Sequence, residues 1–163
     1  MSLDTEAARR EFLTCRLGDE SYGIDILQVQ EIREVRQVTR VPHVSHYVRG
    51  VVNLRGAIVP VVDLGLMFGF DKPIDLAEAS AIVLNVDGRL VGIVVTAVSD
   101  VIALADDEIM PAPELAARKI GTAIAGIGTR KPAEGEAPKD ARDASVLLLD
   151  VATIMRRIRE DAE

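Results

Sequence analysis

The chain has 163 residues, of which 48% are hydrophobic, and a formal net charge of −7. A core of useful size can form, but either half alone would be marginally stable. Because the chain is acidic and has only three phenylalanines, two tyrosines and no tryptophan, we exclude nucleic acid as a partner. A single cysteine, Cys15, excludes an internal disulfide. No apolar run reaches the ~18 residues of a membrane span, so we expect a cytoplasmic protein that does not insert directly into membranes.

The first half of the chain predicts mainly strands. We expect a disordered N-terminus at 1–10 and a first β lobe at 11–80. Within this lobe, Val29 and Ile32 stand three residues apart in Leu27–Val35, a spacing that favours a short helical turn. The predicted extended segments are Glu11–Leu17, Tyr22–Ile26, Val38–Val41, Gly50–Leu54 and Ala57–Leu64.

The second half repeats this order, and we assign a second β lobe to 81–163. Its loop at 130–145 has no large apolar residue and is predicted to be mobile. A helix is expected at 151–159, with Asp150 as its N-cap and an apolar face that covers a barrel. The predicted strands are Ala81–Val86, Leu90–Val95, Ile124–Ile127 and Val146–Leu149, and a turn of helix ends at Val101.

The two halves share a repeated pattern. Gly23-Ile24 is echoed by Gly92-Ile93, with apolar residues at the same intervals beyond each pair, and Val62-Asp63-Leu64 is echoed by Leu149-Asp150-Val151. The repeat is too long for a solenoid and has the size of a small β subdomain. We therefore predict a mainly β fold of two similar barrels that arose by internal duplication. A crevice between two such lobes would be a place to bind a partner.

Candidate catalytic residues are few. His43 and His46 are three apart but lack further ligands nearby, so we interpret them as loop histidines and expect no metal and no cofactor. Asp63 and Asp150 occupy equivalent places in the two copies, which favours strand-end or capping roles over a carboxylate pair. Cys15 alternates with apolar neighbours and is interpreted as a small strand side chain. We predict that the protein is not an enzyme.

Several side chains suit contact with a partner instead. Val29 and Ile32, with their counterparts Val98 and Val101, either pack in the core or face a groove for the apolar stripe of a partner helix. Arg55 lies in a tight turn between two apolar strands, where packing gives no reason for an arginine, although exposed turn arginines are common.

The order and spacing of several segments closely resemble the bacterial chemotaxis coupling protein CheW family, from about Glu11 to Ile158. The segments that carry the resemblance are Glu11–Leu13, Leu17–Ile32, Val38–Pro42, Gly50–Leu64, Val91–Val95 and Val98–Val101. The resemblance implies two SH3-like five-stranded barrels with a short C-terminal covering helix. It also implies a scaffold that links chemoreceptor signalling tips to the regulatory domain of the histidine kinase CheA.

Site residues follow from the same resemblance, position by position. Those implied at or near a receptor groove are Val29, Arg55, Val98 and Val101, with Gly50 supporting it. Those implied near a kinase-binding face are Glu31, Ile32, Val38, Thr39 and Arg40. Self-association in receptor arrays at the membrane is compatible with the duplication. Two alternatives stay open: an adaptor of a chemosensory pathway that controls pili or gene regulation, and a small-molecule-binding β protein.

Overall fold

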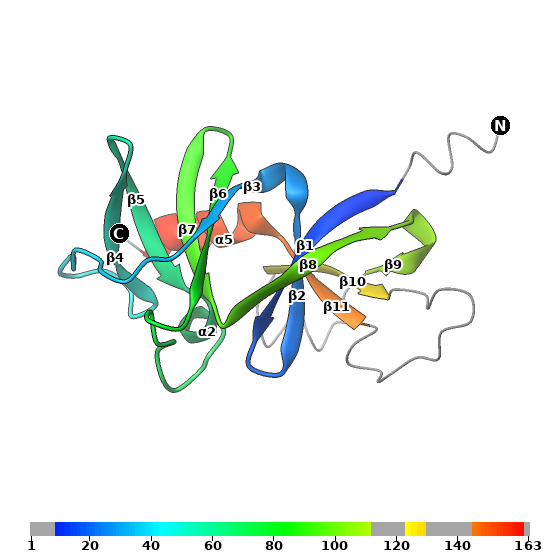
Figure 1. Cartoon of the computed structure of the whole chain (residues 1–163), viewed down its shortest axis with the longest axis horizontal. Helices are drawn as coiled ribbons and strands as arrows, with labels where there is room; N and C mark the ends of the chain where they lie inside the picture. The colour runs from blue at the N-terminus through cyan, green and yellow to red at the C-terminus, as the bar shows by residue number, and fades with distance from the viewer. Residues whose placement is uncertain (1–8, 112–122, 130–144, 162–163) are drawn as a thin grey trace. The chain divides into compact units, whose positions relative to one another are not determined.

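The computed structural model describes residues 9–111, 123–129 and 145–161 (Figure 1). The chain groups into two compact units: Met1–Ile26 with Ser99–Asp150, and Leu27–Val98 with Val151–Glu163. We call these the first and the second unit. Among the described residues, no helix combines the length and the apolar composition needed to cross a membrane.

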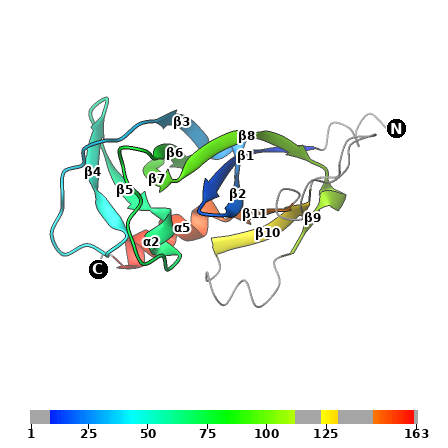
Figure 2. The same cartoon turned by 60° about the horizontal axis from the view of Figure 1, so that its bottom comes forward.

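The second unit is built on a five-stranded sheet with the order β3-β6-β7-β5-β4. Two antiparallel hairpins, β4–β5 and β6–β7, join through a parallel pairing of β5 with β7. The short helix α2 contacts β5 and β7, and α5 contacts β6 (Figure 2). The elements of this unit are η1 (Ile26–Gln28), β3 (Val29–Arg33), β4 (Val48–Leu54), β5 (Ala57–Asp63), α2 (Leu64–Met67), β6 (Ser80–Val86), β7 (Arg89–Val95) and α5 (Val151–Asp161).

The first unit is built on a six-stranded sheet with the order β8-β1-β2-β11-β10-β9. Here too, a parallel pairing, β2 with β11, joins two antiparallel hairpins. Its core contains Phe12, Ile102, Leu104, Val146 and Leu148. The elements are β1 (Arg10–Leu17), β2 (Glu20–Asp25), β8 (Ala97–Leu104), η2 (Asp106–Glu108), β9 (Ile109–Met110), β10 (Ile124–Thr129) and β11 (Ser145–Leu149).

The two copies of the repeat exchange their first hairpins. The hairpin β1–β2 comes from the first copy but pairs with β11 and β8 of the second. Reciprocally, β6–β7 of the second copy pairs with β5 and β3 of the first. The matching glycines Gly23 and Gly92 occupy equivalent places, because each lies on the strand that makes the parallel pairing. Duplication therefore explains why both sheets have the same pattern of pairings.

The mainly β fold with two sheets is confirmed, with two differences in detail. One sheet has six strands instead of five, because the short strand β9 adds to β10. The compact units are also interleaved along the chain, whereas the expected lobes, 11–80 and 81–163, were continuous. The physical reason is the hairpin exchange, which makes the parallel strand pairings run between the two halves.

Both predicted helical turns are strands. The 3₁₀ turn η1 covers only Ile26–Gln28, and Val29–Arg33 is the strand β3. A β-bulge between Val29 and Glu31 inserts one extra residue opposite β6, which shifts the alternation of side chains and gives Val29 and Ile32 their three-residue spacing. The segment that ends near Val101 likewise belongs to the strand β8.

The helix α5 begins at Val151 as expected and continues to Asp161. Val151 and Ile154 are fully buried, so this face of the helix covers a sheet, as expected. The sheet that it contacts is the five-stranded sheet of the second unit, which contains strands from both halves of the chain. The expected mobile loop at 130–145 and the expected disordered N-terminus lie, except for their last residues, outside the described residues.

Candidate protein-binding site

Arg55 occupies a strained position in the β4–β5 hairpin. Its φ is 54° and that of Gly56 is 89°, so both residues of the two-residue turn are left-handed. Asparagine, aspartate and glycine favour this conformation, whereas arginine does not. The β6–β7 hairpin has the same turn with Asp87 and Gly88, at φ values of 52° and 85°. Arg55 therefore stands where a better turn residue is available, which points to selection for its side chain.

The Arg55 side chain pairs with a carboxylate on a different strand. Its guanidinium donates to Oε2 of Glu31 on β3 at 2.8 Å, and Arg33 donates to the other Glu31 oxygen at 3.3 Å. The hydrogen bond from Arg55 lowers the pKa of Glu31, with a smaller contribution from Arg33. The Arg55 side chain remains 74% exposed, against 20% for Glu31. One carboxylate shared by two arginines leaves an excess positive charge at this surface.

The connection between β3 and β4 folds back onto β4. Thr39 and Val51 exchange two backbone hydrogen bonds of 2.9 Å each. Gly50 is buried beside this bridge with φ at 147°, and a Cβ atom there would lie 2.4 Å from the Thr39 carbonyl oxygen. Only glycine allows this close approach, so Gly50 supports the position of Thr39.

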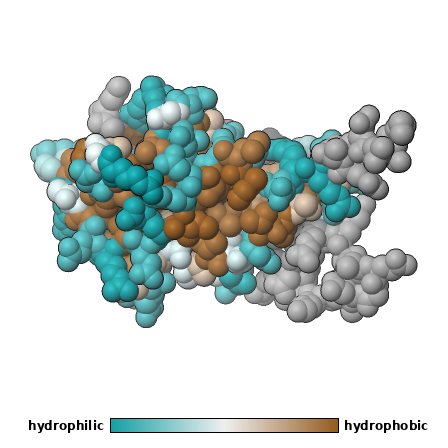
Figure 3. All heavy atoms as spheres, turned by 45° about the horizontal axis from the view of Figure 1, so that its top comes forward, coloured by the Kyte–Doolittle hydropathy of each residue, from teal (hydrophilic) through white to brown (hydrophobic). Residues whose placement is uncertain are grey.

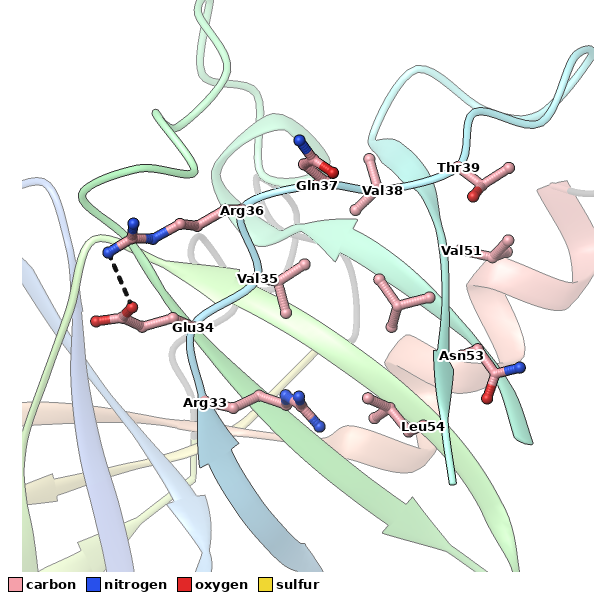
Figure 4. A pocket seen from close by; sticks show the side chains of 11 residues that line it. Arg33, Glu34, Val35, Arg36, Gln37, Val38, Thr39, Val51, Asn53 and Leu54 are labelled. Carbon is pink, nitrogen blue, oxygen red and sulfur yellow. Dashed lines mark hydrogen bonds and ion pairs between the residues drawn. The ribbon is translucent and has the colours of Figure 1, made fainter. Parts of the chain in front are cut away.

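A groove of about 410 Å³ lies beside this bridge (Figure 4). The stretch Arg33–Thr39 faces Val51–Leu54 of β4 across it. Val35 and Val38 contribute to the core below, since Val35 is buried and Val38 packs against the same cluster. The Arg36 guanidinium is paired at 3.2 Å with the exposed carboxylate of Glu34.

Apolar side chains are exposed at several of the predicted contact positions. Ile32 is 48% exposed and Val101 is 47% exposed, whereas Val29 and Val98 are half-buried. Figure 3 shows that hydrophobic residues (brown) are exposed among hydrophilic ones (teal) on the side turned to the reader. Contiguous exposed apolar surface is typical of a protein-binding face, whereas single exposed apolar side chains are common on any protein. A crevice between lobes stays a prediction.

The structure brings together residues that were assigned to two different partners. Glu31, implied at the kinase-binding face, is bonded to Arg55, implied at the receptor groove. Thr39 likewise lies against Gly50. Every implied site residue belongs to the second unit except Val101, and Arg40 is exposed in the β3–β4 connection. Sequence reasoning missed Arg33 and Val51, although their nearness to Glu31 and Gly50 in the sequence was a usable signal.

The candidate catalytic residues have structural roles. Asp63 is fully buried and is the N-cap of α2, accepting hydrogen bonds from Leu66 N at 2.9 Å, Ile74 N at 2.8 Å and Arg49 at 3.2 Å, which confirms its capping role. Cys15 is fully buried in β1, and burial raises the pKa of its thiol from 9.0 to about 12. Within the described ranges, no group of three His, Cys, Asp or Glu side chains could hold a metal ion.

Together, the strained and exposed arginine, the shared carboxylate and the exposed apolar residues define a β-sheet protein-interaction module. The protein-family model described as "CheW-like domain" matches residues 11–159 of this chain. The chain belongs to the CheW-like family.

Individual relatives agree with this assignment. The chain is 46% identical over 123 residues to the chemotaxis protein CheW of Klebsiella aerogenes, covering 76% of this chain and 74% of the relative. It is 39% identical over 107 residues to the chemotaxis protein CheW of Rhizobium meliloti, covering 66% and 69%. The crystal structure of the scaffolding protein TtCheW from Thermoanaerobacter tengcongensis superimposes with a TM-score of 0.73 at 27% identity, covering 87% of this chain and 89% of that one.

Proposed function

We propose that this protein is a non-catalytic adaptor that couples chemoreceptor signalling tips to the regulatory domain of the histidine kinase CheA. The observation that carries the proposal is the CheW-like match over residues 11–159, nearly the whole chain. The surface of the second unit supports it, because arginine is enriched in protein interfaces and the exposed Arg55 lies on this surface.

The receptor contacts in this proposal are Val29, Arg55, Val98 and Val101. The exposed guanidinium of Arg55 can bind a carboxylate of a partner by exchanging it for Glu31. Val101 is exposed enough to bury apolar area on a partner helix. Gly50 acts indirectly, because it is buried and only holds Thr39 in place.

The kinase contacts in this proposal are Glu31, Ile32, Val38, Thr39 and Arg40. They lie on β3 and on the connection that follows it, which the Thr39–Val51 bridge fixes to β4. Between residues 31 and 55 the chain has five arginines and two glutamates, a net charge of +3 in a chain of net charge −7. This local excess favours an acidic surface on the partner and predicts binding that weakens with salt.

The adaptor acts by simultaneous attachment. A protein that holds a receptor and a kinase at once raises the effective concentration of each for the other, so modest pairwise affinities can build an array. This role places the protein in the cytoplasm at membrane-associated receptor arrays, where copies could also contact one another.

Calorimetry tests the proposal directly. The full chain is titrated with a soluble receptor signalling-tip fragment and, separately, with the CheA regulatory domain from the same organism. We expect binding to both partners, and binding of each in the presence of saturating amounts of the other. Binding to neither partner would contradict the adaptor function, and competition between the two would contradict simultaneous attachment.

A further inference from the structure

The last turn of α5 contacts the connection between β3 and β4, far from it in the sequence. Tyr47 is 2% exposed, and its hydroxyl donates to the carboxylate of Asp161 and lies 3.4 Å from the carbonyl oxygen of Arg157. The Ser45 hydroxyl donates to the Asp161 carbonyl oxygen at 3.3 Å. The Arg157 guanidinium lies 5.9 Å from the centre of the Tyr47 ring. We call Tyr47, Arg157 and Asp161 the clamp.

The clamp holds one end of an otherwise exposed loop. At the other end, Thr39 is fixed to Val51 by two backbone hydrogen bonds. Between these anchors, residues 40–43 are exposed and Val44 is half-buried, and this stretch forms no regular element. His43 has a left-handed φ of 63°, a conformation that is uncommon outside glycine, although histidine adopts it more often than most residues. A loop of this kind keeps one conformation only if both ends are fixed.

The loop carries a charge that the proposed function uses. Arg40 lies next to the Thr39 bridge, and among the described residues no ion pair is found for it. An exposed arginine on an ordered loop loses less conformational entropy on binding than one on a mobile loop. The order of the loop therefore affects the affinity for the partner that contacts Arg40.

We propose that Tyr47 and Asp161 are positioning residues: through the clamp, the end of α5 orders the 40–44 loop for binding to the kinase. This inference rests on the proposed adaptor function and adds a role for the C-terminal helix. It assigns Tyr47 no contact with the kinase, since Tyr47 is buried.

The test compares two conservative tyrosine variants. Tyr47→Phe keeps the ring and removes the hydroxyl that reaches Asp161 and Arg157. Tyr22→Phe is the matched control, because Tyr22 is the other buried tyrosine and lies on β2 of the first unit. For Tyr47→Phe we expect amide exchange in residues 40–46 to accelerate by at least roughly threefold and the Kd for the CheA regulatory domain to rise about tenfold. The Kd for the receptor-tip fragment should stay within about twofold of wild type, and Tyr22→Phe should leave all three quantities unchanged.

Asp161→Ala provides a second route to the same result. It removes the acceptor and leaves Tyr47 in place, so its effect on kinase affinity should match that of Tyr47→Phe, and the double variant should be no worse than either. Additive effects would mean that the two residues do not act through one contact and would overturn the inference.

Other outcomes separate the inference from the function on which it rests. If wild type binds the kinase domain and Tyr47→Phe binds it equally well, the inference fails and the adaptor function stands. If Tyr47→Phe weakens both partners alike together with the melting temperature, the clamp is merely structural and the inference also fails. If wild type binds neither partner, the proposed function fails and the inference fails with it.

Discussion

At Arg55, an effect on binding can be tested separately from an effect on stability. The two hairpin turns of the second unit are built alike: Asn53 accepts a hydrogen bond from Gly56 N and Asn85 accepts one from Gly88 N, each at 2.9 Å. The two turns differ at the first left-handed position, which is Arg55 in the β4–β5 turn and Asp87 in the β6–β7 turn. A substitution that suits the turn should therefore remove the arginine without harming the fold.

Arg55→Asn is expected to lose binding and keep stability. Asparagine favours the left-handed conformation, which offsets the loss of the exposed ion pair, so the melting temperature should stay within roughly 3 °C of wild type. Affinity for the receptor tip should fall by about tenfold or more in calorimetry. Asp87→Asn, at the equivalent turn, should change neither quantity. A large drop in melting temperature for Arg55→Asn would show that the arginine is structural.

Gly50→Ala is expected to destabilise the second unit. The new Cβ would overlap the Thr39 carbonyl oxygen at 2.4 Å, and the φ of 147° disfavours any side chain. We expect the free energy of unfolding in urea to fall by on the order of 2–4 kcal/mol. Gly92→Ala is the control, since its nearest contact would be an ordinary 3.7 Å. Equal effects of the two substitutions would rule out the Thr39 contact as the cause.

Because its thiol is buried, Cys15 should make the free energy of unfolding fall at alkaline pH. Its thiol has a pKa of about 12 when folded, against 9.0 when free, so above pH 9 the unfolded chain releases a proton that the folded chain keeps. The thiol's contribution is thus complete below pH 9 and is lost as pH rises toward 12. In urea unfolding from pH 8 to 10, Cys15→Ala should show a shallower decline than wild type. If the free energy of unfolding declined equally with pH in the two proteins, burial would not raise the pKa of the Cys15 thiol. Tyr22 and Tyr47, whose pKa values are raised to about 12, add to the decline above pH 10 in both proteins.

At the scale of elements, Asp63 joins a strand, a helix and a loop. It ends β5, caps α2 and accepts hydrogen bonds from Arg49 and from Ile74 in the connection to β6. Asp63→Ala would leave the Arg49 guanidinium without its buried partner and should cost about 3–5 kcal/mol of unfolding free energy. Asp63→Asn, which keeps an acceptor for the cap, should cost less. If circular dichroism melting finds the two variants equal, the charge contributes nothing at this site.

The local elements were predictable to different degrees. The hairpin around Arg55-Gly56 and the two strands on either side of Asp87-Gly88 were correctly predicted, because alternating apolar residues around a glycine turn define a hairpin locally. The strand β3 was misread as helical, because the bulge after Val29 depends on pairing with β6, which no local pattern reveals. The contact between Glu31 and Arg55 was missed for a similar reason, since it requires the hairpin turn to reach back to β3.

At the scale of the whole molecule, the duplication was visible in the sequence and the hairpin exchange was not. Two similar copies offer each strand two similar partners, so a repeated pattern alone cannot say whether β2 pairs within its own copy or with the other one. The structure pairs Tyr22 with Leu147 and Val61 with Gly92, both across the copies.

Neither half of the chain should fold alone. A fragment of residues 1–80 contains β1–β5 but lacks β11, β10 and β8 for one sheet and β6 and β7 for the other. We expect poorly dispersed NMR spectra and no cooperative unfolding for fragments 1–80 and 81–163 measured separately, and recovery of dispersion when they are mixed. A well-dispersed spectrum of either fragment by itself would contradict the exchanged topology.

The exchange also sets when the protein can fold during its synthesis. The hairpin β1–β2 leaves the ribosome well before its parallel partner β11, because most of the other strands lie between them in the sequence. Until then, an apolar hairpin edge stays unpaired in the nascent chain, where unpaired edges invite aggregation. The first unit can therefore complete its sheet only after β11 has been made, and chaperone protection of the unpaired hairpin would matter more here than in a chain whose lobes form in order.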